Sequence, residues 1–306
     1  MALNIVTSTQ PLTINHLIIF LYGDPGVWKT SLAFTAKKPI LFDFDKGAYR
    51  ASNRKDTVQI QNWLEVVNFT ADDLAGYDTI IIDTAGRVLD LITDFLKQDA
   101  KNIRRGSGEL SMQGYGKLAT TFTNWLKMLR NMDKDIVILA HAGEDKDGDN
   151  IIKRPDMVGG SKKEVYKIAD MMGYMTVQQG MNGAERVLSF APSPNYLAKD
   201  SGQIGNVILK PMSQSPNQLG DMIEATKNHI NRLTAEQAQA QKELDDFRAE
   251  LLEAKTADEL NELKDRLNQN HPFTHEMKRA IMDSANKLGA KFNRATNHFE
   301  QGAASA

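Results

Sequence analysis

Apolar runs separated by polar, glycine-containing segments organise the chain as far as about Pro211. Four of these runs predict buried strands, at residues 16–22, 39–47, 77–84 and 135–140. A strand without a polar face is typical of a parallel sheet that helices cover on both sides. Between the first and third strands there is room for a helix, the second strand and another helix. The pattern therefore predicts an α/β core with a mainly parallel sheet.

Beyond about Pro211 the apolar positions recur at helical spacing. We expect the core to occupy residues 1–212, and residues 213–306 to form an extension of three or four helices. The polar faces of these helices carry charges of both signs, which suits a solvated bundle, an oligomer contact or a partner site. The last residues, 302–306, are expected to be disordered.

Local signals divide the extension further. Thr234 with Gln237, and Thr256 with Glu259, each match the capping box that begins a helix. A break is expected at His271-Pro272. After that break a further helix is expected from the spacing of Met277, Ile281, Leu288 and Phe292. His271 and His275 lack the support needed to name them metal ligands.

Composition limits the possible classes of protein. The 306 residues include no cysteine, which excludes both disulfides and thiolate metal sites. No apolar stretch approaches the length of a membrane span and no leader pattern is present, so a cytoplasmic protein is expected, in the host cytoplasm if a phage encodes it. The net charge of −2 means that any nucleic-acid site must be a local basic patch.

The segment 23–30, Gly-Asp-Pro-Gly-Val-Trp-Lys-Thr, matches the phosphate-binding pattern G-x-x-x-x-G-K-[ST] except at Trp28, where the second glycine is expected. A predicted strand precedes it, and residues 31–36 are expected to begin a helix. Strand, loop and helix follow in the required order. The predicted nucleotide-binding residues are Gly23, Asp24, Pro25, Gly26, Val27, Trp28, Lys29, Thr30 and Ser31.

The residue types explain the chemistry of this loop. Backbone N–H groups at the helix N-terminus point at phosphates, and the helix dipole favours their negative charge. Lys29 is expected to reach the β- and γ-phosphates of ATP, and the Thr30 hydroxyl to ligate Mg²⁺. The Trp28 side chain either tolerates ordinary helical backbone angles with its ring turned away or crowds the nucleotide.

Polar residues follow the other predicted strands. Asp83 ends an apolar strand, as expected of a second Mg²⁺ ligand. Asp43 and Asp45 alternate on one strand face, and Asp45 is the candidate that orients or deprotonates the attacking water. The alternative is that both acids cap the next turn. His141 ends the fourth strand, where it is either a γ-phosphate sensor or an ordinary hydrogen-bonded histidine.

These positions resemble the RecA-like phage nucleotide-binding proteins, an AAA-labelled ATPase family that includes Sak-type single-strand annealing proteins. The resemblance covers about residues 14–212 and is carried by the loop 23–30, the strand ends at 41–45, 80–83 and 138–141, and Gly114-Tyr115-Gly116. It implies a RecA-like P-loop core that hydrolyses ATP while binding and annealing single-stranded DNA. It also implies a single-strand-binding protein as partner, and a homo-oligomer. Trp28 departs from the family pattern.

A basic patch is the candidate for DNA binding. It surrounds the glycine-containing segment 106–108, and Tyr115 is available to stack on a base. The alternative is that these charges only solvate the surface. The patch residues are Lys97, Lys101, Arg104, Arg105, Tyr115 and Lys117.

A second basic group flanks residues 159–161. Lys153, Arg154, Lys162 and Lys163 are candidates to act on the γ-phosphate of a neighbouring subunit, and the alternative is a surface hairpin. The nearby alternating acids Asp145, Asp147 and Asp149 suggest a calcium loop. That interpretation is rejected, because Asn150 and Asp156 occupy the positions that require glycine and glutamate.

The sequence thus predicts a RecA-like P-loop ATPase that acts on single-stranded DNA in recombination, annealing or replication. Lys29, Asp45, Asp83 and His141 are the predicted catalytic residues, and Thr30 and Asp83 the predicted metal ligands. Two other classes remain open. One is a nucleotide-gated scaffold in which Trp28 blocks hydrolysis, and the other is a helicase or packaging motor.

Overall fold

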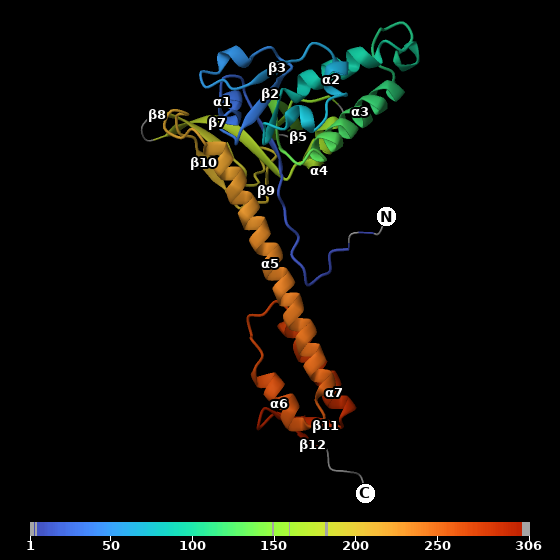
Figure 1. Cartoon of the computed structure of the whole chain (residues 1–306), viewed down its shortest axis with the longest axis vertical. Coiled ribbons are helices and arrows are strands. Elements are labelled where there is room, and N and C mark those ends of the chain that lie inside the picture. Colours follow the sequence, from blue (N-terminus) through green and yellow to red (C-terminus); the bar gives the residue numbers. More distant parts are fainter. Residues whose placement is uncertain (1–2, 4, 149, 159, 181–182, 302–306) are drawn as a thin grey trace. The chain divides into compact units, whose positions relative to one another are not determined.

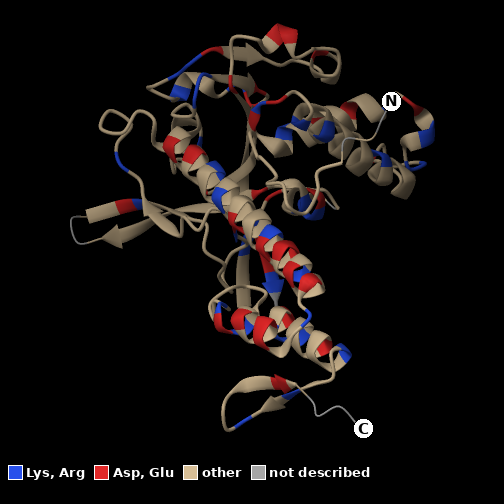
Figure 2. Ribbon diagram, turned by 60° about the horizontal axis from the view of Figure 1, so that its bottom comes forward, with Lys and Arg blue, Asp and Glu red and all other residues tan. Residues whose placement is uncertain are grey.

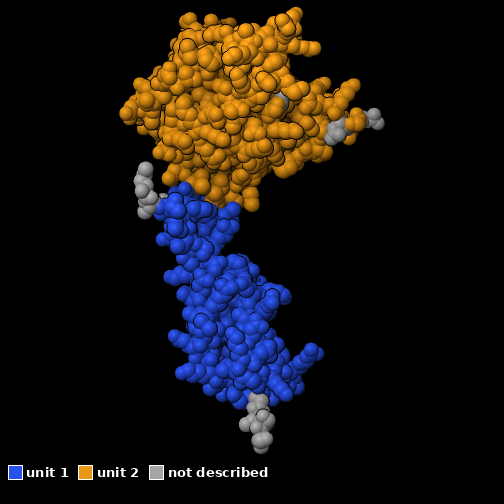
Figure 3. Space-filling view, turned by 90° about the vertical axis from the view of Figure 1, so that its right-hand side faces the viewer, with its two compact units in different colours: residues 1–13, 231–306 blue, residues 14–230 orange. Residues whose placement is uncertain are grey.

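The computed structural model describes residues 3, 5–148, 150–158, 160–180 and 183–301. The chain forms two compact units, residues 14–230 and residues 1–13 with 231–306 (Figure 3). The division lies within helix α5 (Gln218–Glu253), whereas the sequence placed the boundary at residue 212. Residues 302–306, which the sequence predicts to be disordered, lie outside the described residues.

The larger unit is built on a sheet whose six central strands all pair in parallel, so the predicted mainly parallel α/β core is confirmed. Antiparallel strands extend it at one edge, and β6 and β9 pair off the main path. The main order is β10-β8-β7-β1-β5-β4-β2-β3. The strands are β1 (Ile18–Gly23), β2 (Pro39–Asp43), β3 (Thr57–Gln59), β4 (Thr79–Asp83), β5 (Asp135–Asp147), β6 (Asn150–Pro155), β7 (Met171–Gly180), β8 (Gly183–Ser189), β9 (Lys199–Asp200) and β10 (Asn206–Ile208).

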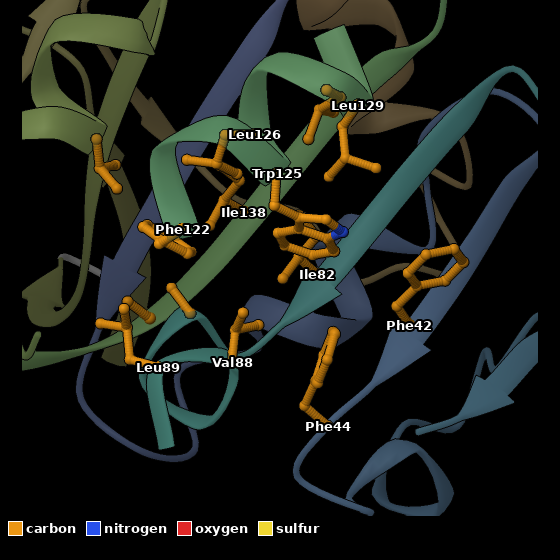
Figure 4. Close-up of a cluster of buried hydrophobic side chains, with 14 of the residues drawn as sticks. Phe42, Phe44, Ile82, Val88, Leu89, Phe122, Trp125, Leu126, Leu129 and Ile138 are labelled. Carbon is orange, nitrogen blue, oxygen red and sulfur yellow. The ribbon is translucent and has the colours of Figure 1, made fainter. Parts of the chain in front are cut away.

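Helices cover both faces of this sheet, which is why the strands have no polar face (Figure 1). On one face α2 (Ala85–Leu96), α3 (Met112–Arg130) and α4 (Ser161–Ile168) share a buried cluster with the strands. Figure 4 shows Phe122 and Trp125 of α3 packed among strand residues such as Ile82 and Ile138. On the other face α1 (Lys29–Ala33) and the start of α5 pack against the alternate strand positions.

Three local predictions in the core are wrong. Between α1 and β4 the chain forms β3 and short 3₁₀ helices instead of a second α-helix. Strand β2 ends at Asp43, so Asp45 lies in the following loop rather than on the same strand face. Strand β5 continues through His141 to Asp147 and forms a hairpin with β6. Cross-strand ion pairs stabilise this hairpin, which is the alternative interpretation of the second basic group in the sequence.

The smaller unit consists of the second part of α5, α6 (Ala257–Asp265), α7 (Thr274–Lys287) and a hairpin of β11 (Ala290–Asn293) and β12 (His298–Gln301). Leu244, Leu260 and Ile281 belong to its own hydrophobic cluster. Helices therefore dominate the C-terminal extension, as predicted.

Two of the local signals in this unit were interpreted incorrectly. The Thr256–Glu259 capping box is confirmed, but Thr234 lies inside α5, where its hydroxyl donates to the carbonyls of Asn231 and Leu12 at 2.9 and 2.7 Å. The residues around Thr234 are good helix formers, so the helix continues through it. Phe292 lies in β11 and not in the helix, because the turn at Gly289 ends the helix before it. Its ring packs edge-on against Phe299.

The packing of α3 on the sheet leads to a stability prediction. Phe122→Ala removes a fully buried ring and should lower the free energy of unfolding by about 3–5 kcal/mol. Tyr115→Ala, on the same helix but 45% exposed, should change it by less than about 0.5 kcal/mol. Urea titration followed by circular dichroism measures both values, and equal losses would contradict the proposed core packing.

Candidate nucleotide site

The predicted site residues converge on one cleft at the carboxyl edge of β1, β4 and β5. Parallel pairing places Gly23 opposite His141 and Asp43 opposite Asp83. The cleft has a volume of about 200 Å³. It is lined by Pro25, Gly26, Trp28, Lys29, Thr30, Ser31, Asp45, Gly47, Arg50, Ala51, Asp83, Thr84 and His141. The predicted residues Gly23, Asp24 and Val27 belong to the same loop without lining the cleft. A larger cleft, of about 660 Å³, contains none of the predicted site residues.

The loop after β1 needs glycine at two positions for different reasons. A Cβ atom on Gly23 would lie 2.3 Å from the carbonyl oxygen of Met175 on β7, so only glycine fits there. Gly26 has a φ of 82°, which is open to glycine at little cost. Gly23 thus lets β1 end close against β7, and Gly26 lets the loop turn toward the start of α1.

Trp28 has left-handed backbone angles, with φ 77° and ψ 22°. Neither alternative drawn from the sequence foresaw this, because the residue has a positive φ, which glycine adopts readily and tryptophan rarely does. A bulky residue held there costs about 1–3 kcal/mol unless other contacts offset the strain. The guanidinium carbon of Arg186, on β8, lies 3.6 Å from the centroid of the indole ring. Arg186 was not foreseen, because nothing in the sequence pairs β8 with this loop.

Lys29 is buried and already held by the loop. Its Nζ donates hydrogen bonds of 2.9 Å to the carbonyl oxygens of Gly23 and of Asp24. Burial lowers the pKa of Lys29, and the nearby carboxylates of Asp83 and Asp24 oppose that shift. The ammonium group therefore lies at the base of the loop, where an anion would offset the loss of solvent.

Thr30 and Asp83 meet, as predicted for metal ligands. The Thr30 hydroxyl donates a 2.7 Å hydrogen bond to Oδ2 of Asp83. The pKa of Asp83 is raised to about 6, chiefly by burial; the neighbouring Asp43 contributes to the rise, while Thr30 and Lys29 oppose it. A hydroxyl and a carboxylate are hard oxygen ligands, which suits Mg²⁺. The described residues contain no group of three His, Cys, Asp or Glu side chains placed to hold a metal. Nucleotide-bound Mg²⁺ needs only one or two protein oxygens.

The two acids after β2 have different roles. Asp43 is buried, and its carboxylate accepts hydrogen bonds of 3.0 Å from the N–H groups of Gly47 and Ala48. It caps the turn, as the alternative interpretation held. Asp45 lines the cleft and forms ion pairs with Arg87 at 3.2 Å and Arg50 at 3.7 Å. The two arginines hold the Asp45 carboxylate at the cleft, where it can accept a hydrogen bond from a water molecule and orient it.

His141 lies on β5 and faces the cleft. Its Nδ1 is buried and has no hydrogen-bond partner within the described residues. Burial and the nearby charge of Lys29 lower the pKa of His141, which favours a neutral ring at pH 7. A neutral imidazole with an open nitrogen can bind a polar group that enters the cleft.

The two basic groups differ in their surroundings. Lys101, Arg104 and Arg105 are exposed in the connection from α2 to α3, where Figure 2 shows several blue segments. Lys97 is half-buried at the end of α2, Tyr115 is 45% exposed, and Lys117 donates to the side-chain oxygen of Asn102 at 2.7 Å.

In the second group three of the four charges are paired within the chain. Lys153 pairs with Glu144, while Arg154 and Lys162 both pair with Asp145. Lys163 is exposed, and Gly159 lies outside the described residues. Two of these pairs join β5 to β6 and the third joins β5 to α4, so this group is less available to a neighbouring subunit than the sequence suggested.

The raised pKa of Asp83 leads to a prediction for the metal-free protein. A carboxyl group with a higher pKa in the folded state destabilises the fold progressively as pH rises from about 4 to 6. Asp83→Asn removes this penalty and can still accept from Thr30. At pH 7.5 it should be more stable than the wild type by about 2–3 kcal/mol, with the difference disappearing near pH 4. Urea titrations at both pH values measure this.

Asp94→Asn on α2 is the matched control for the Asp83 variant, because Asp94 is exposed. Its stability should match that of the wild type at both pH values. A stability gain for Asp83→Asn that does not depend on pH would contradict the role of ionisation.

Comparison with known proteins places the chain in a family. Two similar solved structures, both with a TM-score of 0.35, are a KaiC-like protein from the archaeon Pyrococcus horikoshii OT3 and the flagellar accessory protein FlaH from Methanocaldococcus jannaschii. The first is 12% identical over 65% of this chain and 91% of its own, and the second is 11% identical over 64% and 86%. No curated protein matches the chain. A family described as an AAA domain matches residues 15–201, a range that contains every residue lining the cleft. The chain belongs to this AAA domain family.

Proposed function

We propose that the protein is a RecA-like P-loop ATPase that binds ATP with Mg²⁺ and hydrolyses it. The observation that carries this proposal is the meeting of Lys29, Thr30 and Asp83 in one cleft at the start of α1. Family membership supports the same conclusion, since the matched range contains the whole cleft. A buried lysine, a hydroxyl and a carboxylate around a helix N-terminus form the donor set that a Mg²⁺-bound triphosphate requires.

Each residue has a separate task in this proposal. The loop N–H groups and Lys29 bind the phosphates, and Lys29 is already positioned by the Gly23 and Asp24 carbonyls. Thr30 and Asp83 would hold Mg²⁺, which when bound neutralises charge on the phosphates. Positioning of this kind contributes most of the catalysis in phosphoryl transfer.

Two further residues would act near the γ-phosphate. Asp45, oriented by Arg87 and Arg50, would position the attacking water. His141 would accept or donate a hydrogen bond through its unpartnered Nδ1 and so report the presence of the γ-phosphate.

Lys29→Ala tests the ATPase assignment. Loss of the buried ammonium should lower the rate of phosphate release by at least about 100-fold, because the charge of the transferring phosphoryl group loses its main protein partner. Lys127→Ala, at an exposed position of α3, is the control and should keep the wild-type rate. Phosphate release measured with Mg²⁺-ATP compares the two variants. An unchanged rate in Lys29→Ala would contradict the assignment of this cleft as the ATPase site.

We also propose that the ATPase acts on single-stranded DNA, in recombination, annealing or replication of the phage type. The supporting observation is the set of exposed cations Lys101, Arg104 and Arg105, together with the partly exposed ring of Tyr115 in the first turns of the helix that follows them. Cations that follow a phosphate backbone, with an aromatic ring for base stacking, are typical of single-strand binding. A homo-oligomer and a single-strand-binding protein as partner belong to the same proposal.

The position of this basic patch suggests how it communicates with the ATP site. Helix α2 begins at Ala85, two residues after Asp83, and its last residue, Leu96, precedes Lys97. A single helix therefore extends from the proposed Mg²⁺ ligand to the proposed DNA contact. A shift of α2 on nucleotide binding would move both.

The double variant Arg104→Ala/Arg105→Ala tests the DNA contact. Two lost phosphate contacts should weaken the binding of labelled oligothymidylate. They should also reduce the magnitude of the negative slope of log affinity against log salt by about 1.4. Lys127→Ala/Arg130→Ala removes two cations from the other end of α3 and is the control. Fluorescence anisotropy at several salt concentrations measures the slope, and an unchanged slope would exclude this patch.

A second candidate is favoured by Trp28. A left-handed tryptophan at the usual glycine position suits a nucleotide-gated scaffold that binds ATP without hydrolysing it. Nucleotide binding without phosphate release, with and without single-stranded DNA, would identify the scaffold.

A further inference from the structure

We propose that Arg186 of β8 is a positioning residue for the phosphate-binding loop, which acts by holding Trp28 in its left-handed conformation. This inference rests on the proposed nucleotide site and deepens it, because it explains how the loop functions without its second glycine. Arg186 does not line the cleft, so its effect on the ligand is exerted through Trp28.

The contact itself is unusually close. The Arg186 guanidinium carbon lies 3.6 Å from the centroid of the Trp28 ring, well inside the range for a cation–π contact. Within the described part of the chain no carboxylate pairs with Arg186, and its Nε is buried without a hydrogen-bond partner. The indole face is therefore the main interaction that compensates this cation for its partial loss of water.

The sheet brings Arg186 to this position. Strand β7 pairs in parallel with β1, so that Met175 lies opposite Gly23. Strand β8 pairs antiparallel with β7, with Leu188 opposite Met175 and Arg186 opposite Val177. Arg186 therefore lies two residues beyond the level at which β1 ends, beside the loop. The close packing of Gly23 on the Met175 carbonyl fixes the base of the loop against the same pair of strands.

The conformation of Trp28 matters for the neighbouring backbone. Trp28 is the N-cap of α1, and the N–H groups that follow it are those that a phosphate would meet. If its φ returned to the region that tryptophan prefers, the peptide plane before Lys29 would rotate and those groups would point elsewhere. Stacking on Arg186 favours the left-handed state, so it should strengthen the binding of any phosphate ligand that needs that state.

A double-mutant cycle tests this coupling. Arg186→Ala should weaken the binding of Mg²⁺-ADP, measured by titration calorimetry, by about tenfold, because the strained loop is no longer held. In a Trp28→Gly background the same substitution should change the affinity by less than about twofold, since glycine adopts positive φ unaided. Arg186→Lys should restore part of the affinity, because it keeps a cation without the planar stack. Equal losses in both backgrounds would overturn the proposal.

A nucleotide-free measurement separates this inference from the proposed function. Subtracting the fluorescence spectrum of Trp28→Phe isolates the emission of Trp28, since Trp63 and Trp125 are buried in the core. Arg186→Ala should change that emission, whereas Arg130→Ala, a control that removes an arginine paired with Asp170, should not. Circular dichroism confirms folding of each variant.

The outcomes are distinguishable. A wild-type protein that binds no ADP, but whose Trp28 emission responds to Arg186→Ala, would refute the nucleotide site and support the positioning of Trp28. An emission that does not respond to Arg186→Ala would overturn the positioning role, whatever the ADP affinity.

Discussion

The parallel pairing of β1 between β5 and β7 is the constraint on which the site depends. Because the strands are in register, the end of β1 at Gly23 lies opposite His141 on one side and Met175 on the other. The adjacent β4 delivers Asp83 to the same edge. The loop after β1 must therefore turn immediately, and it turns into α1, whose first residues Lys29 and Thr30 face those strand ends. Backbone hydrogen bonding thus assembles residues that are far apart in the chain.

The assembled edge concentrates charge where water is scarce. Lys29 and Asp83 are both buried. Burial lowers the pKa of Lys29 and raises that of Asp83, so it favours the neutral form of each group. Asp43 is satisfied by two backbone N–H groups, and Asp45 by two arginines, while the His141 Nδ1 has no partner among the described residues. A bound anion with its metal cation would offset much of the cost of burying these charged groups. The electrostatics therefore favour ligand binding at the expense of the stability of the empty protein.

Trp28 shows how one unusual residue is accommodated. Its backbone is left-handed, and its ring packs against Arg186 on β8. The loop is thereby connected to the β7–β8 hairpin on one side. On the other side, Asp83 is connected to α2 and the basic α2–α3 connection. The two connections extend from the same cleft to two different surface segments.

Local patterns in the sequence determined the parts of the site that are continuous in the chain. The apolar runs identified β1, β2 and β4, and the phosphate-loop pattern identified Lys29, Thr30 and the position of Trp28, because these signals depend on neighbouring residues. Only the tertiary structure decided the environment of each residue. The end of β2 at Asp43 separated the roles of Asp43 and Asp45, the β5–β6 pairing extended the fourth strand beyond His141, and the β7–β8 hairpin placed Arg186 on Trp28. These outcomes depend on contacts between distant segments, which no local periodicity encodes.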